Sequence, residues 1–288
     1  MTAWVRAALL LCAALPALAP AAEQHQQADV PFVVTPPNVV DAMLKIAGVS
    51  ARDFVIDLGS GDGRILIAAA KQYGARGLGV DIDPHLVDTA RQQARREGVA
   101  DRVRFIVENL FTTELDSATV LTMYLYPRVM TQLRPRMFAE LKPGSRIVSH
   151  EFDMEDWPAD GRVTIPVPDK PYGPPSSDVF LWILPANAAG VWRWRAAEVD
   201  YEVTLSQTFQ ALEGGAVAGG RAGRVERGKM QGDEIRLTLT AEVGGRMQRQ
   251  ELSGRVSGDS ISGTIKTDGG ERDWKAARAR RGNIDIKQ

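Results

Sequence analysis

The sequence predicts an α/β domain built on a doubly wound, mostly parallel sheet, followed by a small antiparallel all-β domain. Apolar runs alternate with helical patterns over residues 54–150, in the order that a parallel sheet needs. A glycine-rich turn at residues 59–63 joins the first of these runs to a helical pattern. From residue 191 onward the helical patterns stop, and short alternating runs separated by glycine turns take their place.

Length and composition agree with an ordinary globular protein. The chain has 288 residues, enough for one large domain or two modest ones. It is 25% charged and 44% hydrophobic, and its formal net charge is −1. Because there is no excess of positive charge, we expect no nucleic-acid partner.

The first 21 residues have the pattern of a secretory signal peptide. Arg6 precedes an apolar run, and Ala19 and Ala21 have the spacing of a signal-peptidase site. The run is too short and too rich in alanine for a stable membrane span. Cys12 lies inside it without a small residue before it, so we expect no lipidation. The expected location is therefore periplasmic or secreted, or cytoplasmic if the start codon is misassigned.

The elements of the first domain follow one another after a polar linker over residues 22–30. Prolines extend the segment 31–36, and the domain runs from there to residue 187. Helices are expected over residues 39–47, 64–73, 84–97 and 128–141. Parallel strands are expected over residues 54–58, 77–81, 103–107, 118–123 and 146–150. Residues 163–167 and 179–184 would close the sheet as an antiparallel pair around the proline-rich loop 168–175.

The turn at residues 59–63 reads Gly-Ser-Gly-Asp-Gly. Its alternate glycines permit positive φ and leave backbone N–H groups bare for a ligand. The dinucleotide-binding fingerprint needs a further glycine three residues after the second one, where this chain has Arg64. Asp57, before the turn, suits an ammonium group, whereas a pyrophosphate would be repelled by Asp57 and Asp62. The turn therefore favours a cofactor that carries an amino acid.

The second strand ends in Asp81, about 20 residues after the turn begins, where a carboxylate suits the hydroxyls of a ribose. With the motifs Asp57-Leu58-Gly59-Ser60-Gly61-Asp62-Gly63 and Gly79-Val80-Asp81-Ile82-Asp83-Pro84, the chain resembles the class I S-adenosylmethionine-dependent methyltransferases. The resemblance implies a Rossmann-like sheet of seven strands whose last strand is antiparallel, and S-adenosylmethionine as the cofactor. The cofactor-binding residues that it implies are Asp57, Gly59, Ser60, Gly61, Gly63, Asp81, Ile82, Asn109 and Thr35.

The roles of two of these residues are inferred from their positions in such a fold. Asn109 follows the third strand, where methyltransferases present a polar residue to the adenine edge. Thr35 lies in a segment that often closes over the cofactor in this class. Each residue also has a structural reading, since Asn109 could be a solvated loop residue and the segment around Thr35 a simple proline turn.

The candidate catalytic residues follow the fourth and fifth strands. Ligands of open α/β sheets bind outside the carboxyl ends of the strands, so Tyr124 and Tyr126 are expected to face the reacting methyl group. Their rings or hydroxyls could steady the positive charge of the sulfonium and of an ammonium product. His150 and Glu151, at the end of strand five, are candidates for an acid/base or substrate contact. Packing beneath a helix would explain the tyrosines equally well.

The second domain, over residues 191–280, is expected to be a β-meander that forms a barrel or a sandwich. Trp192, Trp194 and Trp274 are expected to be core residues rather than a ligand cage. We find no spacing of metal ligands and expect no metal. This domain could recognise a substrate, a partner or a surface.

A narrower resemblance concerns the methyl acceptor. The segments Thr122-Met123-Tyr124-Leu125-Tyr126-Pro127 and Pro31-Phe32-Val33-Val34-Thr35-Pro36 are similar to those of bacterial relatives of the mitochondrial lysine methyltransferases that modify ATP synthase and the adenine nucleotide translocase. The resemblance implies a protein-lysine N-methyltransferase. The alternatives are a small-molecule O- or N-methyltransferase and an exported binding module that keeps the fold without turnover.

Overall fold

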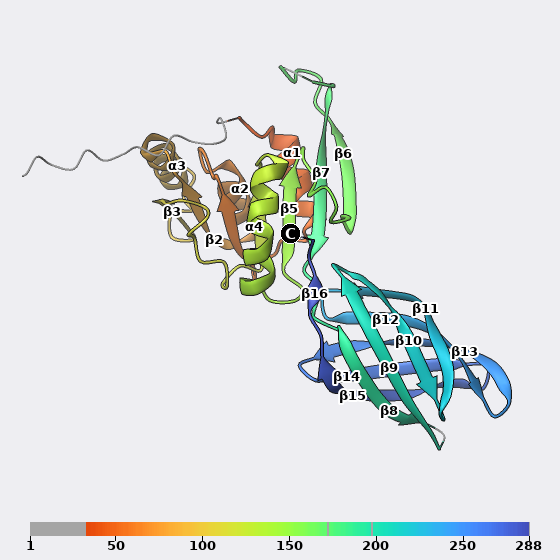
Figure 1. The fold of residues 1–288 in the computed structure, drawn as a ribbon. Coiled ribbons are helices and arrows are strands. Elements are labelled where there is room, and N and C mark those ends of the chain that lie inside the picture. The colour runs from red at the N-terminus through yellow and green to blue at the C-terminus, as the bar shows by residue number, and fades with distance from the viewer. Residues whose placement is uncertain (1–32, 172, 197, 288) are drawn as a thin grey trace, which may run out of the picture.

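The computed structural model describes residues 33–171, 173–196 and 198–287, which form an α/β part and a β-barrel. Figure 1 shows the α/β part in red to green and the barrel in teal to blue, joined end to end. The expected signal peptide and linker, as well as the first residues of the segment 31–36, lie outside the described residues.

The α/β part contains four helices and seven strands within the described residues, in the expected order. The helices are α1 (Pro37–Ile46), α2 (Arg64–Tyr73), α3 (Pro84–Arg96) and α4 (Pro127–Glu140). The strands are β1 (Phe54–Leu58), β2 (Arg76–Asp81), β3 (Val103–Val107), β4 (Val120–Met123), β5 (Arg146–His150), β6 (Gly161–Pro166) and β7 (Ser176–Ile183). Strand β4 begins two residues later than expected, because the backbone N–H of Ala118 donates to the Leu115 carbonyl oxygen in a turn instead of joining the sheet.

The seven strands form one sheet in the order β3-β2-β1-β4-β5-β7-β6. Neighbours from β3 to β5 are parallel, and β7 is antiparallel to both β5 and β6. The expected Rossmann-like methyltransferase sheet with an antiparallel last strand is confirmed. The strand order reverses between β1 and β4, so the crevice beyond their carboxyl ends is where this fold binds ligands.

Two apolar clusters cover the two faces of the sheet. One combines the buried sides of α1, α2 and α3 with β1 and β3. The other combines α4 with β1, β4 and β5 and includes Trp157 and Trp182. Because helices pack on both faces, the loops after the parallel strands β1, β2, β4 and β5 are left to meet at one edge of the sheet.

Gly63 shows how tightly the first turn is built. It has a φ of 81°, and an added Cβ would lie 2.6 Å from the Phe105 ring and 2.8 Å from the Ala90 Cβ. Replacing Gly63 with alanine should lower the free energy of unfolding by about 1–3 kcal/mol through overpacking. The strain of placing alanine in a left-handed backbone conformation comes in addition. Gly98 is the matched control, because its φ is 68° and an added Cβ meets nothing within 4 Å. Denaturant unfolding of G63A and G98A measures the difference, and equal losses would contradict this packing.

The second part is a closed barrel of eight antiparallel strands with a short extra strand. Its strands are β8 (Gly190–Ala196), β9 (Val199–Thr208), β10 (Ala211–Ala218), β11 (Arg221–Gln231), β12 (Glu234–Val243), β13 (Arg246–Ser257), β14 (Ser260–Thr267), β15 (Gly270–Arg281) and β16 (Ile284–Asp285). Pairing of the last long strand, β15, with the first strand, β8, closes the ring, because all other neighbours in the ring are consecutive along the chain. As expected, Trp192, Trp194 and Trp274 are buried in the core of the barrel.

The turn between β9 and β10 fixes the barrel to the α/β part. Phe209, in that turn, stacks on Trp157 with ring centroids 5.5 Å apart. The Trp157 indole N–H donates to Gln210 at 2.9 Å. Arg134 of α4 donates to the carbonyl oxygens of Ile286 and Lys287, so the chain end returns to the α/β part (Figure 1). The two parts therefore share one aromatic interface.

Two kinds of feature are absent from the described residues. No helix among them is both long and apolar enough to span a membrane. Among the same residues there is no group of three or more His, Cys, Asp or Glu side chains placed to hold a metal ion.

Candidate active site

The loop between β1 and α2 is a tight turn held by strand β2. The backbone N–H groups of Gly59 and Ser60 both donate to the Val80 carbonyl oxygen at 2.9 Å. Gly59 and Gly61 have φ values of 75° and 52°, which side-chain-bearing residues rarely adopt. The glycines at these positions therefore give the loop its shape and leave its outer backbone open to a ligand.

Asp57 is a buried acid at the start of this loop. Its side chain is 1% exposed, and its Oδ1 accepts a hydrogen bond from the Thr122 hydroxyl at 2.7 Å. Its Oδ2 is buried without a partner. Burial raises the pKa of Asp57 to about 7, and the nearby Asp81 and Asp62 carboxylates add to the rise. An ammonium group at Oδ2 would reverse that effect, so Asp57 is built to receive a cation.

Asp81 ties the end of β2 to the glycine loop. Its carboxylate accepts hydrogen bonds from the backbone N–H of Gly61 at 2.8 Å and of Asp83 at 3.0 Å. Ile82, next along the chain, is half-buried. The Ser60 hydroxyl in the same loop is buried without a partner. The structure thus brings both sequence-predicted acids and the glycine turn to one crevice.

Thr35 connects the segment before α1 to this crevice. Its hydroxyl lies 3.2 Å from Nδ1 of His150, and its carbonyl oxygen accepts from Arg64 at 2.9 Å. Arg64 is in turn paired with Asp62. The arginine that replaces the dinucleotide-fingerprint glycine therefore fastens the N-terminal segment over the loop. Sequence reasoning did not find that role.

Asn109 lies in the loop after β3. Its Oδ1 accepts a hydrogen bond from the backbone N–H of Phe111 at 2.9 Å, and its carbonyl oxygen accepts from Thr112. The side-chain oxygen thus shapes the loop. The expected contact with an adenine ring stays a prediction.

An aromatic group lies beyond β4 and β5. The Tyr124 ring is 4.0 Å from the His150 ring and 6.1 Å from the Phe152 ring. Tyr126 lies 5.7 Å from Phe152 and is 39% exposed. Burial lowers the pKa of His150 to about 4, so the imidazole is neutral at neutral pH. The buried Nε2 of His150 has no hydrogen-bond partner, and the expected acid/base or substrate contact of His150 stays a prediction.

Glu151 and Lys170 form a nearly buried ion pair next to this group. Lys170 donates to Oε1 of Glu151 at 2.7 Å and to the Ser176 carbonyl oxygen at 2.8 Å, and its side chain is 8% exposed. Oε2 of Glu151 is buried without a hydrogen-bond partner, 3.8 Å from Nε2 of His150. Glu151 also has a φ of 70°, a conformation that is strained for glutamate and is found at functional sites.

Comparison with known proteins identifies the family of the chain. Residues 57–161 match the family model of the ANTKMT methyltransferase domain. A protein-lysine N-methyltransferase of Saccharolobus islandicus is 40% identical over 156 residues, which are 54% of this chain and 94% of that protein. The chain belongs to this methyltransferase family. A lysine N-methyltransferase of Xenopus laevis, named for its action on ATP synthase, is 33% identical over 177 residues, which are 62% of this chain and 72% of that protein.

A solved structure is also similar. It is that of an RNA methyltransferase from Salinibacter ruber in complex with S-adenosyl-L-homocysteine, with 46% sequence identity and a TM-score of 0.48. The match covers 52% of this chain and 93% of that chain.

The methyltransferase is S-adenosylmethionine-dependent, and its crevice fits that cofactor. The partnerless Oδ2 of Asp57 suits the ammonium of the methionine part. The left-handed glycines leave bare backbone for the cofactor to lie against. The Asp81 carboxylate, fixed by Gly61, suits the ribose hydroxyls. When bound, S-adenosylmethionine supplies a methyl group on a sulfonium.

Asp81 is the simplest test of the ribose contact. Replacing Asp81 with asparagine should weaken binding of S-adenosylhomocysteine by about 1–3 kcal/mol, the scale of a hydrogen bond to a charged group. Asp83 is the matched control, because its side chain caps α3 by accepting from His85, and asparagine caps equally well. Calorimetric titration of D81N and D83N measures the difference. Equal affinities would place the ribose elsewhere.

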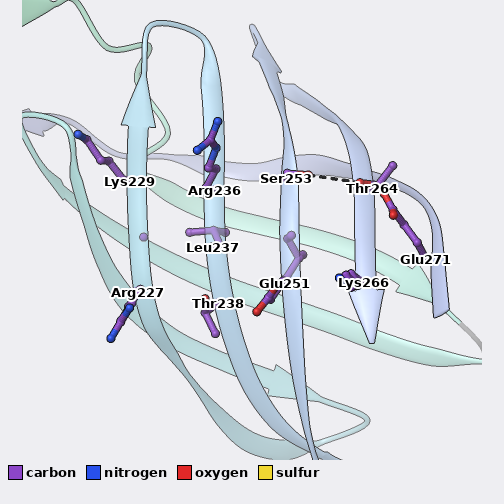
Figure 2. Close-up of a pocket in the computed structure, with 12 residues that line it drawn as sticks. Arg227, Lys229, Arg236, Leu237, Thr238, Glu251, Ser253, Thr264, Lys266 and Glu271 are labelled. Atoms are coloured by element: carbon purple, nitrogen blue, oxygen red, sulfur yellow. Dashed lines mark hydrogen bonds between the residues drawn. The ribbon is translucent and has the colours of Figure 1, made fainter. Parts of the chain in front are cut away.

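The barrel carries a separate hollow on its outer wall. It measures about 380 Å³ and is lined from strands β11 to β15. Figure 2 shows its basic side chains Arg227, Lys229, Arg236 and Lys266 beside the acidic Glu251 and Glu271. Because basic and acidic side chains are mixed over this exposed surface, its charge favours neither anionic nor cationic ligands.

Proposed function

We propose that the methyltransferase modifies lysine side chains of proteins. The observation that carries the proposal is the buried Oε2 of Glu151, which has no hydrogen-bond partner and lies 3.8 Å from Nε2 of His150, whose ring in turn packs against Tyr124. A carboxylate oxygen next to aromatic faces is the surrounding that an alkylammonium group prefers. The similar proteins from Saccharolobus islandicus and Xenopus laevis are named as lysine N-methyltransferases, which supports lysine as the acceptor.

The residues of this chain would act on the acceptor mainly by position. Oε1 of Glu151 is taken by Lys170, which leaves Oε2 to receive the acceptor ammonium and to hold the proton that the amine must lose before it can attack. The rings of Tyr124, Tyr126 and Phe152 steady the positive charge and exclude water. Because burial keeps His150 neutral, its imidazole adds no second positive charge near the sulfonium. Methyl transfer needs no nucleophilic side chain, so orientation is the main contribution.

The test is the chemical form of the transferred methyl group. Purified protein is incubated with methyl-labelled S-adenosylmethionine and a total cell extract, and the labelled protein is hydrolysed to amino acids. The proposal expects label in ε-N-methyllysines. Label that is removed by ribonuclease, or that appears in small metabolites, would contradict it, and the latter result would support the small-molecule alternative. D57N serves as the cofactor-deficient control.

The cellular location is part of this proposal. The signal-like residues 1–21 support a periplasmic or secreted enzyme whose acceptors are envelope proteins. N-terminal sequencing of the protein from whole cells tests this, since cleavage after Ala21 is expected. An intact N-terminus in the cytoplasmic fraction would contradict export.

A further inference from the structure

The interior of the barrel holds a connected group of polar and aromatic side chains. The Gln250 amide donates to the Tyr201 hydroxyl at 2.9 Å, and both residues are buried. The Tyr201 ring stacks on the Trp194 ring with centroids 5.0 Å apart and an interplanar angle of 3°. Trp194 in turn meets Trp274 edge to face at 5.6 Å. These four residues, from β8, β9, β13 and β15, are called the barrel cluster below.

Three polar atoms of the barrel cluster are buried without hydrogen-bond partners. They are the indole nitrogens of Trp194 and Trp274 and the Oε1 of Gln250. Leaving a buried polar group unpaired costs about 1–3 kcal/mol, and native proteins contain only a few such groups per 100 residues. Three unpaired polar atoms in one cluster therefore destabilise this part of the barrel unless a ligand or water pairs with them.

The remaining described tryptophans show that this chain normally pairs its indole nitrogens. Trp157 donates to Gln210 at 2.9 Å, Trp182 to the Trp157 carbonyl oxygen at 2.9 Å, and Trp192 to the Ala188 carbonyl oxygen at 2.8 Å. Trp192 lies on the same strand as Trp194, two residues away. Among the described residues, the unpaired indole nitrogens are thus confined to the barrel cluster.

The barrel cluster lies toward the end of the barrel that faces away from the α/β part. Tyr201 pairs with Ala218 beside the β10–β11 turn, whereas the β9–β10 turn with Phe209 contacts the α/β part at the opposite end. The buried side chains near this end include two small ones, Ala218 and Ala241. Barrels of eight strands are just wide enough to enclose one small ligand.

We propose that the barrel cluster binds a small uncharged ligand that carries an amide. An amide carbonyl accepts from the indole N–H groups of Trp194 and Trp274, and its N–H donates to Oε1 of Gln250. The ring faces suit an apolar or aromatic body on the same molecule.

The buried polar side chains in the described part of the barrel include the glutamines Gln207, Gln210 and Gln250. The Arg278 side chain is also buried, but its guanidinium is already engaged by Asp259 and by the carbonyl oxygens of Asn187 and Ala189. An ionic ligand would therefore lose its hydration without gaining a free countercharge.

The experiment uses benzamide as the probe and the full-length protein labelled with ¹⁵N. The indole N–H signals are assigned with single tryptophan-to-phenylalanine variants. On titration with benzamide, the signals of Trp194 and Trp274 should shift in a saturable manner, whereas those of Trp157, Trp182 and Trp192 should stay in place. Toluene, which has a similar shape without the amide, and benzoate, which is charged, should each bind at least ten times more weakly.

Two variants test the cluster directly. Q250L removes the Gln250 amide at similar volume, W274F removes the Trp274 indole N–H, and each should weaken benzamide binding at least tenfold. R249Q is the matched control, because Arg249 is the neighbouring residue on β13 and is exposed. Equal shifts with toluene would overturn the proposal, and so would unmoved signals of Trp194 and Trp274. Long-lived water cross-peaks at both indoles that benzamide leaves unchanged would show that the group holds structural water instead.

Discussion

Replacing Asp57 with asparagine is expected to weaken binding of S-adenosylhomocysteine by about 100-fold or more, the usual loss when one partner of a buried, hydrogen-bonded charge pair is removed. Asparagine keeps the shape of the side chain and can still meet Thr122, so the loss reports the charge. Calorimetric titration at pH 8 measures it.

The same variant should also remove a pH dependence. The pKa of Asp57 is raised to about 7 in the protein without ligand, and an ammonium ligand favours the carboxylate. Affinity of the wild type should therefore fall as pH drops below about 7, by up to tenfold per unit. D57N should show no such fall. An unchanged pH profile in D57N would place the ammonium at another group.

The stability of ligand-free D57N shows whether its weaker binding of S-adenosylhomocysteine comes from the lost charge or from misfolding. Because the folded pKa of Asp57 lies above its ordinary value of 3.8, its contribution to stability is lost as pH rises from 3.8 through about 7. Asparagine carries no proton in this range, so ligand-free D57N should melt no lower than the wild type at pH 8. A lower melting temperature would show that the carboxylate supports the fold.

Replacing Glu151 with glutamine is expected to lower kcat/KM for a lysine acceptor by about 100-fold, the scale of one positioned acid/base group. Glutamine cannot hold the proton of the amine, and it weakens the attraction for an ammonium. Binding of S-adenosylhomocysteine should be unchanged, because the role proposed for Glu151 is a contact with the methyl acceptor and not with the cofactor. Initial rates with a lysine-containing protein measure the effect.

Glu155 offers a matched control for that experiment. It is also a glutamate with positive φ, 56°, four residues farther along the chain, but it is exposed. E155Q should retain full activity. Equal losses in E151Q and E155Q would show that local backbone strain, rather than the carboxylate at Oε2, controls turnover.

The features that the sequence could predict are those with local signals. The glycine turn, Asp57 and Asp81 follow from spacing along two consecutive strands, and the structure brings them together through Gly61. The order of helices and strands follows from periodicity, which is why the methyltransferase sheet could be expected and is confirmed.

Other features arise only from tertiary contacts. Arg64 reaches Thr35 across 29 positions of the chain, and Lys170 reaches Glu151 from a proline-rich loop that has no motif. Thr122 could have been found, because parallel pairing of β1 with β4 sets it opposite Asp57. Closure of the β-meander into a barrel depends on pairing of its first strand, β8, with its last long strand, β15, which alternation cannot indicate.

The most direct test of the central claim is a calorimetric titration of the purified protein with S-adenosylhomocysteine and, separately, with NAD⁺. We predict that one S-adenosylhomocysteine binds per chain at pH 8, that binding is strongly weakened in D57N and moderately weakened in D81N, and that NAD⁺ does not bind. Binding of NAD⁺, or an affinity for S-adenosylhomocysteine that both variants leave unchanged, would contradict the claim.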